Sequence, residues 1–201
     1  MIKPLFFALA ALAAAPASAA LVEDQLSSEF PDKLAGGGSA PGALTQTFTP
    51  SVSTIAGLDV LVFGSFAPGE TETITLDLFD PSGDPLLPTL SQSLAAEDHN
   101  SIIGTEIQFR FSPVAITPGA LHSFTVEPTE GFLSVATDRQ DIYPDGQVIA
   151  GNIAQGSIDE TDVVFRTLYE DTAVVPLPAA GWFLLGALGL LGWRARRGAD
   201  A

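Results

Sequence analysis

The chain of 201 residues contains no cysteine, so neither disulfide bonds nor thiolate chemistry can contribute to it. It has two histidines, His99 and His122, and zinc sites favour His and Cys ligands. It also lacks a Gly-x-Ser-x-Gly nucleophile elbow, a His-Glu-x-x-His zinc motif and a phosphate-cradling glycine loop. These absences predict that the protein is not an enzyme and needs no catalytic cofactor.

Aromatic residues other than phenylalanine are also scarce. Both tryptophans, Trp182 and Trp193, lie near the C-terminus, and the only tyrosines are Tyr143 and Tyr169. A glycosidase uses two carboxylates ~5–10 Å apart. In a chain with 24 Asp and Glu residues some pair will have this spacing by chance, so the spacing alone does not indicate a glycosidase. Without aromatic rings to line a cleft, neither a glycosidase nor an aromatic sugar-binding platform is expected.

Basic residues are also scarce. The chain has 8 Lys and Arg against 24 Asp and Glu. One acid and four basic residues lie outside residues 20–173, which leaves 23 acidic and 4 basic residues and a formal charge of −19 for that segment. Binding to nucleic acid or anionic lipid depends on Lys and Arg, so both are excluded as partners. The charge instead favours solubility, salt tolerance or the capture of divalent cations.

Residues 1–19 have the three parts of a secretory signal peptide. Lys3 supplies the basic start, Leu5–Ala15 form an apolar core, and Ala17-Ser18-Ala19 has the A-x-A pattern. The core is too short to cross a bilayer, which takes ~20 residues. We therefore expect export by the secretion machinery and cleavage by signal peptidase between Ala19 and Ala20. The alternative is a buried N-terminal helix.

The C-terminal segment, residues 174–201, begins with a long run of mainly apolar residues. Val174–Trp193 carries no charge over 20 residues, and Arg194, Arg196 and Arg197 follow it. This length suits one transmembrane helix, and the arginines should remain cytoplasmic while the domain lies outside. A buried helix of the domain is the alternative.

Residues 20–173 have the pattern of an all-β domain. Apolar and polar residues alternate over short segments separated by Pro, Gly, Asp and Ser. In Thr71–Phe79, for example, Ile74, Leu76 and Leu78 share one face, and Thr73, Thr75 and Asp77 share the other. The expected strands are Ala43–Thr49, Leu58–Phe63, Thr71–Phe79, Glu106–Phe111, Leu121–Glu127, Gly131–Thr137 and Asp162–Tyr169. Pro-Gly at 68–69 and 118–119 predicts type II turns. Seven or eight such strands predict an antiparallel β-sandwich, with a jelly roll preferred over a barrel.

The tail resembles a known sorting signal. Val175-Pro176-Leu177-Pro178-Ala179, an apolar run and Arg194-Ala195-Arg196-Arg197 follow one another as in the VPLPA variety of the PEP-CTERM tails of Gram-negative bacteria. The resemblance covers residues 175–201, and Gly198–Ala201 is its one departure. It implies that an exosortase-like membrane protease cuts near the pentapeptide and releases or re-anchors the protein at the cell surface.

The domain is similar to jelly-roll domains of exported bacterial proteins. The similarity lies in core and turn residues: Gln46–Thr49, Ile74–Asp80, Ile107–Phe111, Ile116–Gly119 and Asp162–Arg166. Several such domains resemble carbohydrate-binding modules, although a fold by itself does not define a ligand. Three hypotheses remain: a non-enzymatic surface or extracellular-matrix protein, a calcium-stabilised adhesion module for extracellular polysaccharide, or an uncut single-pass membrane protein.

Calcium is the one metal that the composition favours. Ca²⁺ takes 6–8 oxygen ligands, and acidic residues gather in three loops. The candidate ligands are Asp80, Asp84, Asp138, Asp141 and Asp145, with Asp159–Asp162 as a further loop. None matches the EF-hand spacing, and turns also favour Asp and Gly. Of the histidines, His99 is expected in solvent and His122, in phase with Phe124 and Val126, at the border of the core.

Overall fold

The computed structural model describes residues 19–27, 38–40, 42–64, 67–98, 104–138, 143–151 and 161–171. Its contacts define one compact unit over Leu21–Asp171. Residues 1–18 and 172–201 lie outside the described residues.

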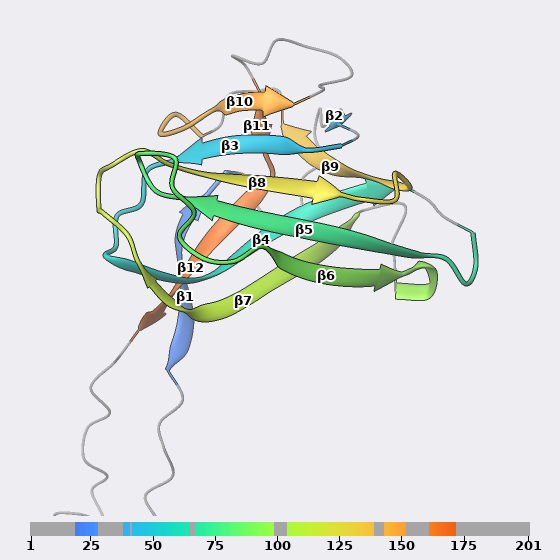
Figure 1. Ribbon diagram of the computed structural model, residues 1–201, viewed down its shortest axis with the longest axis horizontal. Helices are drawn as coiled ribbons and strands as arrows, with labels where there is room; N and C mark the ends of the chain where they lie inside the picture. The colour runs from blue at the N-terminus through green and yellow to red at the C-terminus, as the bar shows by residue number, and fades with distance from the viewer. Residues whose placement is uncertain are drawn as a thin grey trace, which may run out of the picture. The chain divides into compact units, whose positions relative to one another are not determined.

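The domain consists of two antiparallel sheets (Figure 1). Sheet A contains β1 (Ala20–Leu26), β2 (Gly38–Ala40), β4 (Thr54–Gly64), β7 (Thr105–Ala115), β9 (Leu133–Asp138), β11 (Asp162–Val163) and β12 (Phe165–Asp171). Sheet B contains β3 (Leu44–Phe48), β5 (Thr71–Phe79), β6 (Leu90–Ala95), β8 (His122–Pro128) and β10 (Val148–Gly151). A single turn of 3₁₀ helix, Ala96–Asp98, follows β6. The predicted all-β sandwich is therefore confirmed.

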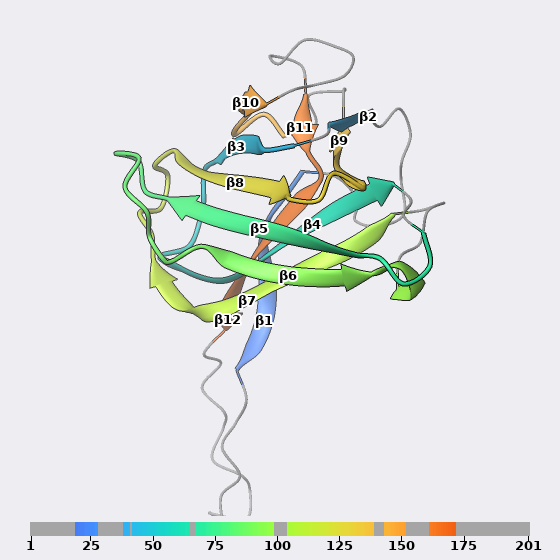
Figure 2. The same ribbon diagram turned by 45° about the vertical axis from the view of Figure 1, so that its right-hand side comes forward.

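Strand β4 is the centre of sheet A. It pairs with β7 along one side, and on the other side with β12 over Gly57–Val60 and with β9 over Val62–Gly64. Val164 joins β11 to β12, donating to Ala136 of β9 and accepting from Leu61 of β4. Sheet B has the order β10-β3-β8-β5-β6, so β6 lies at its edge. Figure 2 shows β5 crossing in front of β4, and β6 crossing in front of β7.

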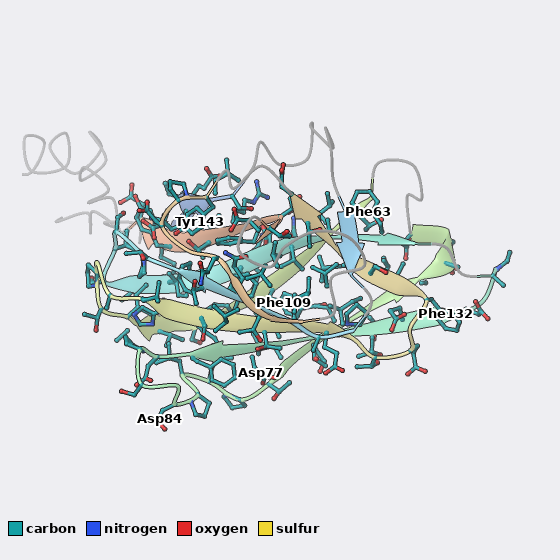
Figure 3. The ribbon with its side chains drawn as sticks, turned by 90° about the horizontal axis from the view of Figure 1, so that it is seen from above. Phe63, Asp77, Asp84, Phe109, Phe132 and Tyr143 are labelled. Atoms are coloured by element: carbon teal, nitrogen blue, oxygen red, sulfur yellow. The ribbon has the colours of Figure 1, made fainter. Side chains whose placement is uncertain are left out.

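The core lies between the sheets, because alternate residues of each strand face inward. Leu58, Val60 and Val62 of β4 are fully buried, as are Ile74, Leu76 and Leu78 of β5. Phenylalanine rings fill the centre: the centroids of Phe124 and Phe165 are 5.0 Å apart in an edge-on arrangement. Figure 3 shows Phe109 between the sheets. Four large fully buried phenylalanines supply the apolar surface that a domain without disulfides requires.

All seven predicted strand segments are present, and β5 has the predicted bounds. Both Pro-Gly turns also form, with Gly69 and Gly119 at positive φ and i→i+3 hydrogen bonds of 3.0 and 3.2 Å. The sequence reasoning missed β1, β2, β6 and β10. In β6 only Leu94 is buried, so this edge strand lacks the alternation that identifies a strand with one covered face.

In the part of the chain that the structure describes, no helix is long and apolar enough to cross a membrane. The expected span Val174–Trp193, the pentapeptide Val175–Ala179 and the basic cluster Arg194–Arg197 lie outside the described residues, as does Ala17. The signal peptide and the sorting tail therefore stay predictions. Ala20, the expected new N-terminus, is the first residue of β1.

Candidate functional site

The first predicted calcium loop stabilises itself. The Asp80 carboxylate accepts hydrogen bonds from the backbone N–H groups of Ser82 and Asp84, at 2.8 and 2.9 Å. Gly83 closes the same turn by donating to the Asp80 carbonyl, at 3.0 Å and with φ of +87°. Asp84 lies in this exposed loop after β5 (Figure 3). An aspartate that caps its own turn explains the composition of this loop without a metal ion.

The other two acidic loops each have one described residue in neighbouring strands of sheet A. Asp138, the last residue of β9, faces Asp162, the first residue of β11, in antiparallel register. The Asp162 carboxylate accepts from the Gln46 side chain at 3.0 Å and from the backbone N–H of Tyr143 at 3.1 Å. Asp162 therefore joins the two sheets, because Gln46 belongs to β3.

Asp145 lies in the turn before β10 and is exposed. Its backbone carbonyl accepts a hydrogen bond of 2.8 Å from the Thr49 hydroxyl. Asp141 lies outside the described residues. Among the residues that are described, no group of three His, Cys, Asp or Glu side chains is arranged to hold a metal ion. Calcium binding stays a prediction.

His122, expected at the border of the core, is buried, with 2% of it exposed. Its Nε2 accepts from the backbone N–H of Thr117 at 3.2 Å, which assigns the proton to Nδ1. Nδ1 then donates to the Phe79 carbonyl at 3.3 Å. Because both ring nitrogens hold the backbone in place, His122 is unsuited to act as a general base. His99 lies outside the described residues.

A buried ion network on sheet A was not foreseen from the sequence. Asp59 of β4 is fully buried, and Arg110 of β7 and Arg166 of β12 both bind its carboxylate. Arg166 donates through Nε at 2.8 Å and also reaches Glu106 at 2.7 Å. Burial opposes the charged form of Arg166, but its hydrogen bond and ionic attraction to Asp59 outweigh this, and the pKa of the guanidinium is raised.

The network depends on Gly57, two residues before Asp59 on the same strand. Gly57 lies opposite Arg110, and a Cβ there would come within 3.2 Å of the Arg110 guanidinium. Glycine thus leaves space for the arginine to lie across β4 toward Asp59. The network holds together three neighbouring strands of one sheet, so we interpret it as structural.

The outer face of sheet B carries an array of hydroxyl groups. Two strands have the pattern T-x-T-x-T, over Thr45–Thr49 and Thr71–Thr75, and alternation places these residues on one face. Six residues of this outer face, all exposed or half-buried, are here named the hydroxyl face: Thr45, Thr73, Thr75, Ser91, Ser93 and Thr125. Sequence reasoning identified the polar side of β5, but it could not identify which strands lie beside it.

Strand register brings the residues of the hydroxyl face together in pairs. Thr73 faces Ser93 and Thr75 faces Ser91 across β5 and β6. Thr125 of β8 faces Thr45 of β3, and their hydroxyl oxygens are 2.8 Å apart. Opposed residues have Cβ atoms ~4.5–5.5 Å apart, and alternate residues of one strand are ~6.6–6.8 Å apart. The result is a grid of hydroxyls across four neighbouring strands.

Two carboxylates interrupt this grid. Asp77 of β5 faces Thr125 and accepts from the Thr89 hydroxyl at 2.5 Å, and Glu127 of β8 faces Thr75. Figure 3 shows Asp77 on the outer side of β5, away from the core residue Phe109. Thr47 and Thr49 of the first T-x-T-x-T segment have other roles, since both bind the chain around β10. The hydroxyl face is a polar surface able to donate and accept hydrogen bonds.

No known protein-family profile and no curated protein sequence matches the chain.

Proposed function

We propose that the chain is an exported, non-enzymatic protein of the cell surface or extracellular matrix, sorted through its C-terminal tail. The observation that carries this proposal is the order of signals in the sequence: a signal peptide, an acidic β-domain, the pentapeptide Val175–Ala179, an apolar run and a basic cluster. In this reading the domain is the part displayed outside the cell.

The strand pairing supports a jelly-roll assignment for the domain. Strands β2 to β9 pair in nested fashion: β5 with β6, β4 with β7, β3 with β8, and β2 with β9. This is the pairing expected when one long hairpin rolls up into two sheets of four strands, which is how a jelly roll is built. Strands β1 and β10–β12 are additions to this framework.

The roles of the buried polar residues support a non-enzymatic domain. Asp59, Asp162 and His122 each hold strands or turns in place through the hydrogen bonds described above. Glu72 of β5 is likewise fully buried and accepts backbone hydrogen bonds from Phe132 and Leu133 at 2.8 and 3.2 Å. A catalytic base has to reach a substrate, and these groups instead face the protein itself.

Scrambling the pentapeptide tests the sorting step. A chain with Val175–Ala179 in scrambled order should remain uncut and be retained in the membrane, because the protease no longer recognises it. The matched control scrambles Gly198–Ala201, which lie past the basic cluster. Intact masses of the protein from membranes and from medium report the cuts; a scrambled chain that is processed and located like the parent would refute the proposal.

A further inference from the structure

The hydroxyl face and the edge of β6 beside it form one continuous hydrogen-bonding surface. We propose that this surface binds a single chain of a neutral polysaccharide. The inference rests on the proposed function, since an exported domain encounters such polymers outside the cell. It adds to that function the class of ligand and the residues that bind it.

The side chains of this surface have unused hydrogen-bonding capacity. Ser91 and Ser93 are exposed and Thr73 is half-buried, and their hydroxyls make no hydrogen bond to another residue in the described ranges. Thr45 and Thr125 share one hydrogen bond, which leaves one hydroxyl proton and several lone pairs available. Each hydroxyl both donates and accepts, as the hydroxyls of a sugar also do. The two surfaces are therefore complementary in hydrogen bonding.

The backbone of β6 extends this surface to the edge of the sheet. Ala96 donates to the Glu70 carbonyl at 3.1 Å, so residues 70 and 96 form a hydrogen-bonded pair. Such pairs alternate along antiparallel strands, which makes Thr73–Ser93 and Thr75–Ser91 the non-bonded pairs. The N–H and C=O groups of Ser91 and Ser93 consequently point away from β5. Within the described part of the chain, β6 pairs with β5 alone.

Among the described residues no strand pairs with the outer side of β6, and proteins usually avoid such an edge. Exposed edges are commonly protected by Lys, Pro, a bulge or a covering segment. Leu90–Ala95 has the sequence LSQSLA, with neither proline nor charge, and its register with β5 is regular. By contrast, the opposite edge strand β10 is four residues long and contains a register shift. The regular, uncharged edge suits an extended polymer lying along β6.

Charge decides between possible occupants of the surface. The segment 20–173 carries a formal charge of −19, so it repels acidic polymers and also a second copy of itself. Asp77 and Glu127 lie within the surface and add to that repulsion. A neutral polymer incurs no such cost. A basic polymer would be attracted by the whole domain and would not need the hydroxyl face.

The twist of the sheet and the absence of aromatic rings define the binding mode. Neighbouring strands rotate by roughly 20–25°, so four strands cannot match a flat crystalline surface. A single flexible chain can follow the twist. No Trp or Tyr side chain belongs to the hydroxyl face, so we expect weak binding at one site, strengthened when many copies contact one polymer.

Affinity electrophoresis of the full chain in non-ionic detergent tests the proposal. The gels contain dextran, laminarin or galactomannan as neutral polymers, or alginate as an acidic one. We expect retardation by at least one neutral polymer and none by alginate. The variant T73V/T75V/S91A/S93A removes four hydroxyls while keeping side-chain shape, and its affinity should fall about tenfold or more.

A matched control removes four hydroxyls elsewhere. The variant S53A/T54V/S112A/T117V changes β4, β7 and the segments beside them, where these side chains are exposed or half-buried. It should bind like the parent, and both variants should keep the parental circular-dichroism spectrum and thermal midpoint within a few degrees.

Three results would overturn the proposal: no retardation by any neutral polymer, equal loss of binding in both variants, or unchanged binding in the hydroxyl-face variant. A dimer in analytical ultracentrifugation that this variant dissociates would show instead that a second copy covers β6. Because binding is measured on purified protein, its outcome is independent of the pentapeptide experiment in cells.

Discussion

Replacing Asp59 with Asn tests whether the buried ion network stabilises sheet A. The carboxylate accepts two hydrogen bonds from Arg110 and one from Arg166 while being fully buried. An Asn side chain of the same shape keeps one oxygen, but its amide N–H₂ group faces guanidinium donors and its charge is gone. Asp59→Asn leaves two cations beside each other without their common counter-ion.

The structure limits the size of this effect. Removing one partner of a buried ion pair costs ~3–5 kcal/mol. The Arg110 and Arg166 side chains, however, keep 34% and 25% of their surface exposed, and Arg166 keeps its contact with Glu106. Water and Glu106 therefore recover part of the loss, and we expect a decrease in unfolding free energy of about 2–3 kcal/mol. For a domain of this size, that lowers the thermal midpoint by roughly 4–12 °C.

Urea denaturation and thermal melts of the full chain in detergent measure this decrease. The control is Asp84→Asn, which makes the same chemical change and loses the same charge at an exposed position. It should change the unfolding free energy by less than about 0.5 kcal/mol. If Asp59→Asn and Asp84→Asn have equal effects, the network contributes nothing beyond surface charge and the argument is wrong.

Two further changes probe other buried polar groups. Glu72→Gln should lower the unfolding free energy by about 2 kcal/mol. The Glu72 carboxylate accepts hydrogen bonds from the backbone N–H groups of Glu130, Phe132 and Leu133, and a single amide oxygen cannot replace it. Urea melts measure the change, and Glu127→Gln, at an exposed position, is the control. Burial raises the pKa of Tyr143 from 10.0 to about 12, so its contribution to stability is fully present below pH 10 and is lost as the pH rises toward 12. Tyr143→Phe should therefore flatten the decline of stability between pH 10 and 12, and an unchanged decline would contradict the assignment.

The strands of the core were predictable because each buries one face. Thr71–Phe79 alternates so regularly that its bounds agree with β5, and Pro-Gly pairs located the turns at 68–69 and 118–119. β6 and β10 lie at sheet edges, where few side chains are covered, so their sequences lack the period of two. An edge strand can be identified only from the strand with which it pairs, and this pairing is known only from the tertiary structure.

The candidate site was only partly predictable for the same reason. The polar side of β5 was visible as Thr73, Thr75 and Asp77, but Ser91 and Thr125 became its neighbours only through the pairing of β5 with β6 and β8. The acid Asp59 gave no signal, because its partners Arg110 and Arg166 lie 51 and 107 residues away in the chain. Among 23 acids, sequence reasoning had no means to select the one that is buried.

The amino-acid sequence by itself was sufficient to derive the all-β class, the turns, the acidity of the domain and the expected signals at both ends. The strands and turns depend on residues within a few positions of one another, where alternation, proline and glycine act directly on the backbone. The acidity and the expected signals depend on composition, which needs no tertiary structure. Tertiary structure decided which strands are neighbours, which polar groups are buried, and which hydroxyls gather on one face of sheet B. Those outcomes depend on register between distant strands, and a shift of one residue would turn every hydroxyl of a strand toward the core.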